Sequence, residues 1–529
     1  MLMHVPKIFT CVFVRCYGCV HSNVRVRFAP SPTGFLHLGG LRTAFYNYLF
    51  ARKNEGKFIL RIEDTDQKRV KAGSVENLYS MLNWTGLVPD ESPECGGPFE
   101  PYIQSQRLLH YKEKADYLLE SGAAYRCFCS EVRLEILKKE AMRNRVNYGY
   151  DNKCRHLTTA EVHNLLQEEQ PYTIRFKISG GPVSHDDVIF GRYTYDVSEN
   201  EGDFIIMKSD GFPTYHFACV VDDHLMQISH VLRGTEWLIS TPKHILLHQA
   251  LGQQPPKFAH LPLLVNSDGT KLSKRQESLG VEYFKEKGYS PEALLNFLAA
   301  AGGGFGKQEG CYVYDLKTLS SKFQLENMNT SPCSVDMMKL NIFNRNYIAK
   351  ELCTEKGSAA LIEKLREHLL EKYGKKFHEE EKNLPNLFMK KVLLCYKDRI
   401  NNLFDLLIPD MEYLWTTPNH TEVIDKIMLL NIPDSFILGF KQLLVILSSL
   451  SDSDMTQENL GLKLRKLCDD MKLPYAQFMR SLRVLLTGQK DGPGITEILI
   501  MLEKKRSIER ISAVVENIDK VISAEKSSS

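Results

Sequence analysis

Val24–Gly40, with the sequence VRVRFAPSPTGFLHLGG, is the stretch that decides the fold. Alternating apolar and charged residues over 24–28 predict a strand, and residues 29–34, rich in proline, serine and glycine, end it. HLGG at 37–40 then opens an apolar helical run at 41–50. Glycines at the start of a helix let a phosphate approach backbone N–H groups. The stretch predicts a nucleotide site, although similar strand–turn–helix units also occur in α/β domains that bind nothing.

A second motif, NSDGTKLSKR at residues 266–275, lies far downstream. It places Lys271 and Lys274 around Ser273 in a polar loop. In this order the two motifs resemble the class I aminoacyl-tRNA synthetases, which carry a His-x-Gly-His type motif early and a Lys-Met-Ser-Lys-Ser type loop late. The resemblance implies an α/β fold with a Rossmann-type parallel-sheet catalytic domain and an insertion, followed by an all-α anticodon-binding module.

Three positions depart from the fuller family motifs. Gly40 stands where many class I enzymes have a second histidine, and Leu272 and Arg275 replace the methionine and the final serine of the loop. The first change is frequent among glutamyl-tRNA synthetases. Both lysines and the serine are retained, so the groups that stabilise pyrophosphate are still present.

An acidic run narrows the resemblance. KFILRI at 57–62 predicts a second strand, and Glu63 begins the run EDTD that follows it. Ligands of open α/β sheets bind at the carboxyl ends of the strands, where Glu63 would meet a substrate ammonium; the alternative is a solvated loop and helix cap. Glutamyl-tRNA synthetases carry a very similar Arg-Ile-Glu-Asp-Thr-Asp run.

Two arginines are candidates for choosing an acidic substrate. Arg27 and Arg233 stand at predicted strand ends beside motif residues, and a guanidinium pairs bidentately with a carboxylate, although most arginines of a soluble chain lie on its surface. The resemblance implies that the amino-acid pocket is lined by Arg27, Phe28, Ala29, Glu63, Tyr215 and Arg233. It implies ATP contacts from His37, Gly39, Glu236 and Lys271, and catalytic roles for His37, Gly39, Lys271, Ser273 and Lys274.

Three cysteines and a tyrosine form a candidate metal site. Cys127, Cys129 and Cys154 supply thiols, and some bacterial relatives look alike here, with a tyrosine in the place of Tyr150 as the fourth ligand. A structural zinc ion needs four such ligands. The alternative is that the metal has been lost and the thiols pack as small apolar groups.

Composition limits the class of protein. The net charge is +2, which neither supports nor excludes RNA binding, and 13 cysteines in no regular framework indicate reduced thiols. The sequence contains no apolar run of about 18 residues, the length that a membrane-spanning helix needs. Residues 1–22 contain Lys7 and Arg15 and no acidic residue, which favours a mitochondrial transit peptide over a weak signal peptide.

The chain is expected to hold six segments. Beyond residue 347 the apolar spacing is helical throughout, with small basic groups that are either solvated faces or tRNA contacts. The segments are a targeting segment (1–22), the first half of the catalytic domain (23–120), an acceptor-stem-binding insertion (121–202), the second half (203–250), a stem-contact region with the lysine loop (251–346) and a helical anticodon-binding domain (347–529).

The resemblance implies an enzyme that condenses L-glutamate with ATP and passes the glutamyl group to the terminal ribose of tRNA(Glu). It implies a need for Mg²⁺, leaves zinc and tRNA(Gln) open, and predicts a monomer of the mitochondrial matrix with no membrane contact. A glutaminyl-tRNA synthetase is the nearest alternative, which Arg27 and Arg233 disfavour. A non-catalytic tRNA-binding protein is disfavoured by the retained His37, Lys271 and Lys274, and a tRNA-modifying relative by the helical module.

Overall fold

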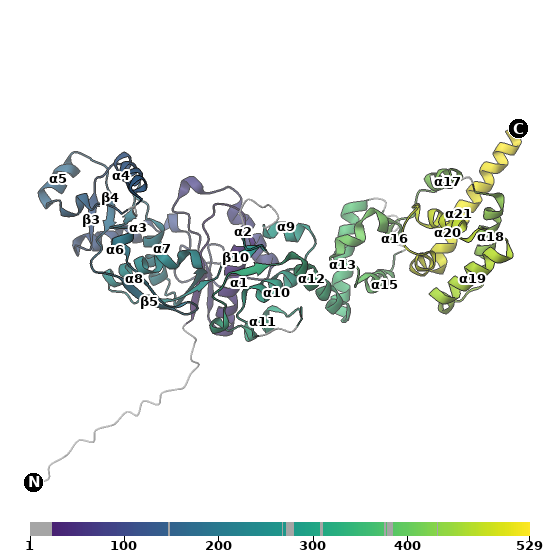
Figure 1. Cartoon of the computed structure of the whole chain (residues 1–529), viewed down its shortest axis with the longest axis horizontal. Coiled ribbons are helices and arrows are strands. Elements are labelled where there is room, and N and C mark those ends of the chain that lie inside the picture. The colour runs from purple at the N-terminus through teal and green to yellow at the C-terminus, as the bar shows by residue number, and fades with distance from the viewer. Residues whose placement is uncertain are drawn as a thin grey trace, which may run out of the picture. The chain divides into compact units, whose positions relative to one another are not determined.

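The computed structural model describes residues 24–145, 149–266, 268–270, 280–306, 310–374, 377, 384–430 and 432–528, with side chains up to 518. The predicted targeting segment and the predicted catalytic residues Lys271, Ser273 and Lys274 lie outside the described residues. The chain divides into two compact units (Figure 1). The first runs to Glu286 and includes Pro291–Leu340, and the second comprises Lys287–Ser290 and Asn341–Ser529.

Parallel strands form the centre of the first unit. β1 (Arg25–Phe28) pairs with β2 (Lys57–Leu60), and β8 (His230–Gly234) pairs with β9 (Lys257–Leu261), both in parallel. The backbone N–H of Ser229 donates to the carbonyl of Arg25 at 2.9 Å, so β8 runs beside β1. Apolar side chains on these strands are fully buried, as parallel sheets covered on both faces require. The predicted Rossmann-type arrangement is confirmed.

Helices cover these strands. α1 (Leu38–Lys53) begins three residues before the predicted run, and its buried Leu38, Leu41, Phe45 and Leu49 recur at helical spacing. The remaining elements of this body are α2 (Ser74–Trp84), α3 (Leu108–Glu120), α7 (Tyr215–Leu225), α8 (Thr241–Ala250), β10 (Leu264–Asn266), α9 (Val281–Glu286), α10 (Pro291–Gly302), α11 (Leu316–Lys322) and β11 (Cys333–Val335).

The insertion has its own antiparallel sheet, in the order β3–β4–β7. The third strand, β7, pairs with β4 and not with the parallel strands, because its buried Ile206 and Met207 pack with Ile174 and Phe176. The elements are β3 (Ala124–Cys127), α4 (Glu131–Asn144), α5 (Thr159–Gln167), β4 (Thr173–Phe176), β5 (Val183–Asp187), β6 (Gly191–Tyr195), α6 (Val197–Asn200) and β7 (Ile205–Met207).

The β5–β6 hairpin leaves the insertion and joins the parallel strands. The backbone N–H of Val188 donates to the carbonyl of Phe258 on β9 at 2.9 Å. A segment predicted to belong to the insertion therefore lies beside the strands that carry the candidate pocket.

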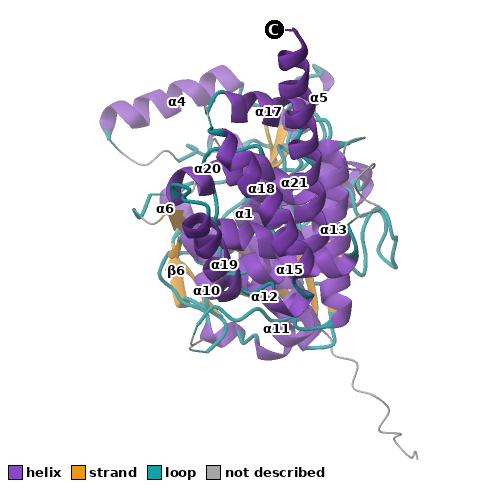
Figure 2. Ribbon diagram, turned by 90° about the vertical axis from the view of Figure 1, so that its right-hand side faces the viewer, coloured by secondary structure: helices purple, strands orange, loops and turns teal. Residues whose placement is uncertain are grey.

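The second unit consists of helices and loops over its described residues (Figure 2). This confirms the predicted all-α module. Its core includes the fully buried Trp415 and the stacked rings of Phe440 and Phe478, 5.0 Å apart. The helices are α12 (Met337–Leu352), α13 (Glu355–Tyr373), α15 (Asn386–Tyr396), α16 (Glu412–Trp415), α17 (His420–Met428), α18 (Asp434–Ser449), α19 (Gln457–Asp470), α20 (Tyr475–Thr487) and α21 (Ile495–Ser528), the last interrupted at Glu503, where φ is 62°. Among the described helices of both units, none combines the length and the hydrophobicity that a membrane span needs.

Candidate active site

His37 caps the first turn of α1. Its Nδ1 accepts a hydrogen bond from the backbone N–H of Gly40 at 3.2 Å. An imidazole nitrogen that accepts carries no proton, so in the neutral ring the proton is on Nε2. The neutral His37 ring therefore carries its proton on Nε2, the tautomer in which this nitrogen can donate to a phosphate oxygen.

The two glycines of the motif make room for this cap. A Cβ on Gly39 would lie 3.1 Å from Cε1 of His37, and a Cβ on Gly40 would lie 2.9 Å from Leu36. The backbone N–H of Gly40 is occupied by the His37 ring, so it is not open to a phosphate in this conformation.

The end of the lysine loop returns to the same place. Gly280, the first described residue after the loop, forms an antiparallel bridge with His37, and the backbone N–H of Val281 donates to the carbonyl of Leu36 at 2.9 Å. The two sequence motifs are thus connected in space by residues on the flank of each.

A buried ion-pair cluster lies at the ends of β1 and β2. Asp223 accepts from Arg27 (Nε to Oδ1, 3.0 Å; Nη2 to Oδ2, 3.2 Å) and from Arg61 (Nη1 to Oδ1, 2.7 Å). Arg61 Nη2 also donates to Glu63 Oε1 at 2.9 Å. Burial alone would raise the pKa of Asp223, but the two guanidiniums overcome it and hold that pKa low. The pKa of Glu63 is raised by burial, which Arg61 offsets in part.

This cluster leaves two atoms for a ligand. Arg27 Nη1 donates to none of the described residues, and Glu63 Oε2 accepts from none of them. Arg27 and Glu63 come from neighbouring strands, because the backbone N–H of Arg61 donates to the carbonyl of Phe28 at 3.0 Å and that of Glu63 to Pro30 at 3.1 Å. A donor for a carboxylate and an acceptor for an ammonium therefore sit on adjacent strand ends.

One face of α7 closes the pocket. Tyr215, Cys219 and Asp223 follow each other at intervals of four residues, so they share a face. Cys219 Sγ lies 3.4 Å from Arg27 Nη2, and burial raises the pKa of its thiol to about 12, so it stays protonated. The charges of Glu63 and Arg27 lie close enough to affect the pKa of Tyr215. Pocket residues from both halves of the catalytic domain therefore lie near one another.

Arg233, on β8, uses all five of its N–H groups within the protein. Nε donates to His260 Nε2 (3.1 Å), Nη1 to the Tyr215 hydroxyl (3.3 Å) and to His244 Nδ1 (3.3 Å), and Nη2 to Thr241 Oγ1 (2.8 Å) and the carbonyl of Trp237 (3.3 Å). The residue is 5% exposed, and these bonds hold its guanidinium in one orientation beside the Tyr215 hydroxyl.

The charge of Arg233 has no counter-ion among the described residues. No carboxylate oxygen of the described residues lies within 4.0 Å of its guanidinium. Its imidazole partners are neutral. Burial is the main cause that holds the pKa of His244 far below the usual value, and Arg233 adds to it. Burial and Arg233 also lower the pKa of His260 to about 4, although its bond to Asp187 acts in the opposite direction. A buried cation without an anion favours a ligand that brings one. Arg233 is thus the unmatched positive charge of the pocket.

The remaining predicted residues flank this pocket. Phe28 is buried at the end of β1, and its ring lies 3.9 Å from a Cβ placed on Gly40, which connects the pocket to the start of α1. Ala29 follows and is half-buried. Glu236 is exposed on the 3₁₀ helix η4 (Thr235–Ser240) just beyond β8, with its carboxylate against Gly234. Within the described residues, the predicted amino-acid and ATP sets are contiguous.

The structure also brings together the four candidate metal ligands. Cys127 and Cys129 Sγ lie 3.3 and 3.4 Å from the Tyr150 hydroxyl, and Cys129 Sγ lies 3.6 Å from Cys154 Sγ. Sulfurs at about 2.3 Å from a tetrahedral zinc ion are roughly 3.8 Å apart, so the spacing fits. Gly202, at φ +70°, lets the loop close, because a Cβ there would meet the Tyr150 carbonyl at 2.9 Å.

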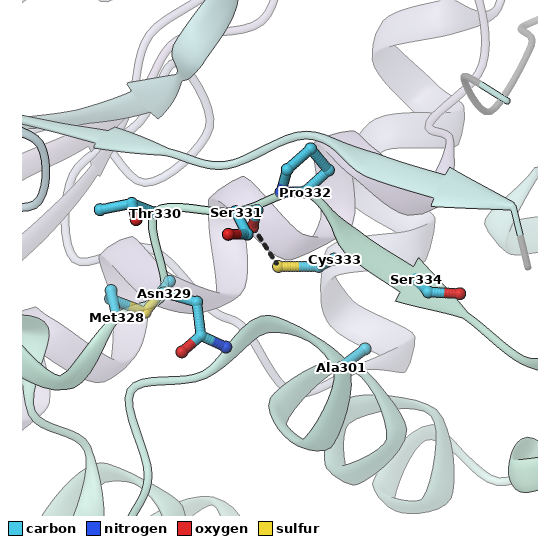
Figure 3. A pocket seen from close by; sticks show the side chains of 8 residues that line it. All are labelled: Ala301, Met328, Asn329, Thr330, Ser331, Pro332, Cys333 and Ser334. Atoms are coloured by element: carbon cyan, nitrogen blue, oxygen red, sulfur yellow. Dashed lines mark hydrogen bonds between the residues drawn. The ribbon is translucent and has the colours of Figure 1, made fainter. Parts of the chain in front are cut away.

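A cavity elsewhere in the first unit is not part of this site. Its volume is about 530 Å³, and its lining is Ala301 and Met328–Ser334, with the Cys333 thiol turned toward the Ser331 carbonyl (Figure 3). The lining contains no acidic or basic side chain.

Known proteins match both halves of the chain. Residues 23–342 match the family described as tRNA synthetases class I (E and Q), catalytic domain, and residues 360–515 match the anticodon binding domain. A glutamate–tRNA ligase of Chloroherpeton thalassium is 38% identical over 510 residues, covering 94% of this chain and 99% of the relative. One from Treponema denticola is 36% identical over 508 residues, covering 93% and 99%. The crystal structure of a glutamate tRNA ligase from Elizabethkingia meningosepticum in complex with its amino acid has a TM-score of 0.76 at 32% identity and covers 93% of this chain and 99% of its own.

The fold, the site and these matches define a class I tRNA synthetase with a catalytic domain and an anticodon binding domain. Within that class, the chain belongs to the glutamate–tRNA ligase family. The glutaminyl-tRNA synthetase and non-catalytic alternatives are not favoured by these relatives.

Proposed function

We propose that this protein activates L-glutamate with ATP to glutamyl-adenylate and transfers the glutamyl group to the 3′-terminal ribose of tRNA(Glu). The observation that carries the proposal is the buried Arg233, which has no counter-ion among the described residues and stands in one pocket with Arg27. A substrate with an acidic side chain supplies the missing negative charge, whereas its amide does not. The charging of tRNA(Glu) with glutamate against glutamine tests it directly.

The chain's own residues position the reactants. Glu63 Oε2 would hold the substrate ammonium, Arg27 Nη1 would donate to its side-chain carboxylate, and the positive charge of Arg233 would attract that carboxylate, so that the α-carboxylate is presented to the α-phosphate of ATP. An in-line attack needs no covalent enzyme intermediate, so catalysis rests on orientation and on donors for the phosphate oxygens. His37 Nε2–H is such a donor. Lys271 and Lys274 are proposed to neutralise the departing pyrophosphate, with Ser273 between them.

Mg²⁺ would neutralise the phosphate oxygens of ATP. Among the described residues, one group of three or more cysteine, histidine or acidic side chains could hold a metal ion. This group is the thiol cluster. The ion would therefore arrive with the nucleotide and take phosphate oxygens as its main ligands, which is common for Mg²⁺.

We expect His37→Ala to lower the rate of glutamate-dependent pyrophosphate exchange, measured with tRNA present, by about a hundredfold, the usual cost of losing one preorganised donor. His37→Asn separates the two roles of this residue, since asparagine is a good N-cap but lacks the Nε2 donor. The Asn variant should keep the wild-type melting temperature and still lose activity. Lys274→Ala is expected to lose as much, and the exposed His163→Ala should change nothing. Wild-type rates in His37→Asn would contradict the phosphate role.

The thiol cluster is proposed to hold one structural zinc ion through Cys127, Cys129, Tyr150 and Cys154. The matching S–S spacing and the placement of the tyrosine hydroxyl between two thiols support it. Metal analysis of the purified protein is expected to give about one zinc per chain, and Cys154→Ser to remove it. Cys353→Ser, at an exposed thiol, is the matched control. Zinc at a wild-type level in Cys154→Ser would contradict this ligand set.

The protein is further proposed to act as a monomer in the mitochondrial matrix and to glutamylate tRNA(Gln) as well as tRNA(Glu). The absence of acidic residues over 1–22 supports the location. Residues 1–22 fused to a fluorescent protein are expected to direct it to mitochondria, and glutamate replacing Lys7 and Arg15 to abolish this. Glutamylation of the two purified tRNAs, side by side, tests the second point, and light scattering gives the mass in solution.

A further inference from the structure

Arg233 is tied to a second buried dyad. The register of β8 and β9 pairs Arg233 with His260, and Arg233 Nε donates to His260 Nε2. Because an arginine can only donate, Nε2 must be the unprotonated nitrogen of the ring. The ring proton is therefore on Nδ1, from which it is donated to Asp187 Oδ2 at 2.6 Å.

Asp187 is fixed in turn. Its Oδ1 accepts from the backbone N–H groups of Ile189 (3.0 Å), Phe190 (2.9 Å) and His260 (3.3 Å), and its side chain is fully buried. One oxygen is thus committed to the backbone and the other to the imidazole. The carboxylate cannot rotate without giving up one of the two sets of bonds.

We propose that Asp187 and His260 are positioning residues, which aim the Arg233 guanidinium at the acidic side chain of the amino-acid substrate. The inference rests on the proposed function. Asp187 selects the His260 tautomer, and His260 gives Arg233 an acceptor without a charge. The carboxylate of Asp187 is connected to the guanidinium only through the His260 ring, so Arg233 keeps its full charge for the ligand. A carboxylate bonded directly to Arg233 would neutralise it.

Asp187→Asn tests the tautomer. If the amide oxygen keeps the three backbone donors, the amide nitrogen faces His260 Nδ1, which must then accept. Nε2 becomes protonated and confronts Arg233 Nε–H, donor against donor. We expect the KM for glutamate to rise about ten- to hundredfold, the range of one unsatisfied buried donor. The selectivity for glutamate over glutamine should fall, while the KM for ATP and kcat at saturating glutamate should stay within about twofold.

His260→Gln and His260→Ala supply the second test. A glutamine can accept from Arg233 and donate to Asp187, so it should restore most of the wild-type KM for glutamate, whereas the alanine should not. Asp186→Asn, at the exposed neighbouring carboxylate, is the control for the change of charge.

Pyrophosphate exchange with tRNA present and thermal unfolding give the readouts. A raised KM for glutamate alone in Asp187→Asn, with rescue in His260→Gln, supports the inference. A wild-type KM in Asp187→Asn, equal losses in His260→Gln and His260→Ala, or a parallel rise in both KM values with a lowered melting temperature would overturn it. A wild-type protein that does not activate glutamate overturns the proposed function instead, so the two failures are distinct.

Discussion

Replacing Arg233 by glutamine is expected to lower kcat/KM for glutamate between about a hundredfold and a thousandfold. Removing one partner of a buried, hydrogen-bonded charge pair costs about 2–5 kcal/mol, and each 1.4 kcal/mol is roughly tenfold. The lost charge is the one that only a substrate can balance, so the effect should appear in the KM for glutamate more than in that for ATP. Aminoacylation of tRNA(Glu) over a range of glutamate concentrations measures it.

A matched control separates the pocket from the general loss of a positive charge. Arg192 is exposed on β6 of the neighbouring hairpin, and Arg192→Gln should leave the kinetics unchanged. The preference of Arg233→Gln for glutamate over glutamine should also shrink. If the preference and the KM for glutamate both remained at wild-type values, Arg233 would not be the residue that receives the substrate's acidic side chain.

Asp223→Asn is expected to be the most destabilising of these substitutions. Asp223 is the shared anion of Arg27 and Arg61, which are 3% and 0% exposed. Stranding a buried charge by removing its partner costs about 3–5 kcal/mol, and here two guanidiniums lose the same carboxylate. A drop in melting temperature on the order of 10 °C should follow in thermal unfolding.

The exposed Asp116 on α3 offers the comparison. Asp116→Asn should leave the melting temperature within about a degree of wild type, since surface substitutions are worth little. A replacement of Arg27 by methionine together with Asp223→Asn should lose less than Asp223→Asn alone, because one stranded cation is removed. An additive loss in the double variant would show that the two side chains do not act as a pair.

Local patterns predicted the elements well and the partners less well. The strand at 24–28, the helix after HLGG and the helical module all follow from periodicity, which is a local property. The partner with which a strand pairs is not a local property. The sequence of β7 suits either sheet, and β7 belongs to the sheet of the insertion. The contact between the His37 ring and the backbone of Gly40 likewise could not be predicted, because it depends on the orientation of the ring.

The missed site residues are those whose meaning depends on distant partners. Arg61 looks like a charged residue at the end of an apolar strand, and its partner Asp223 is 162 positions away. Its burial could have been suspected from the apolar run on either side. Cys219 and Asp223 carried a clearer signal, because they follow the predicted Tyr215 at spacing four on an apolar helix. His260 and Asp187 gave none, because neither stands in a motif.

The β5–β6 hairpin and α7 also constrain the order in which a newly synthesised chain can fold. Arg27 meets Asp223 across 196 residues, and Asp187 meets His260 across 73. Until α7 has been synthesised, burying Arg27 and Arg61 would leave two cations unpaired, which is too costly to persist. The β1–α1–β2 segment therefore cannot reach its final packing early on the ribosome, and the parts of the catalytic body on either side of the insertion fold together or not at all.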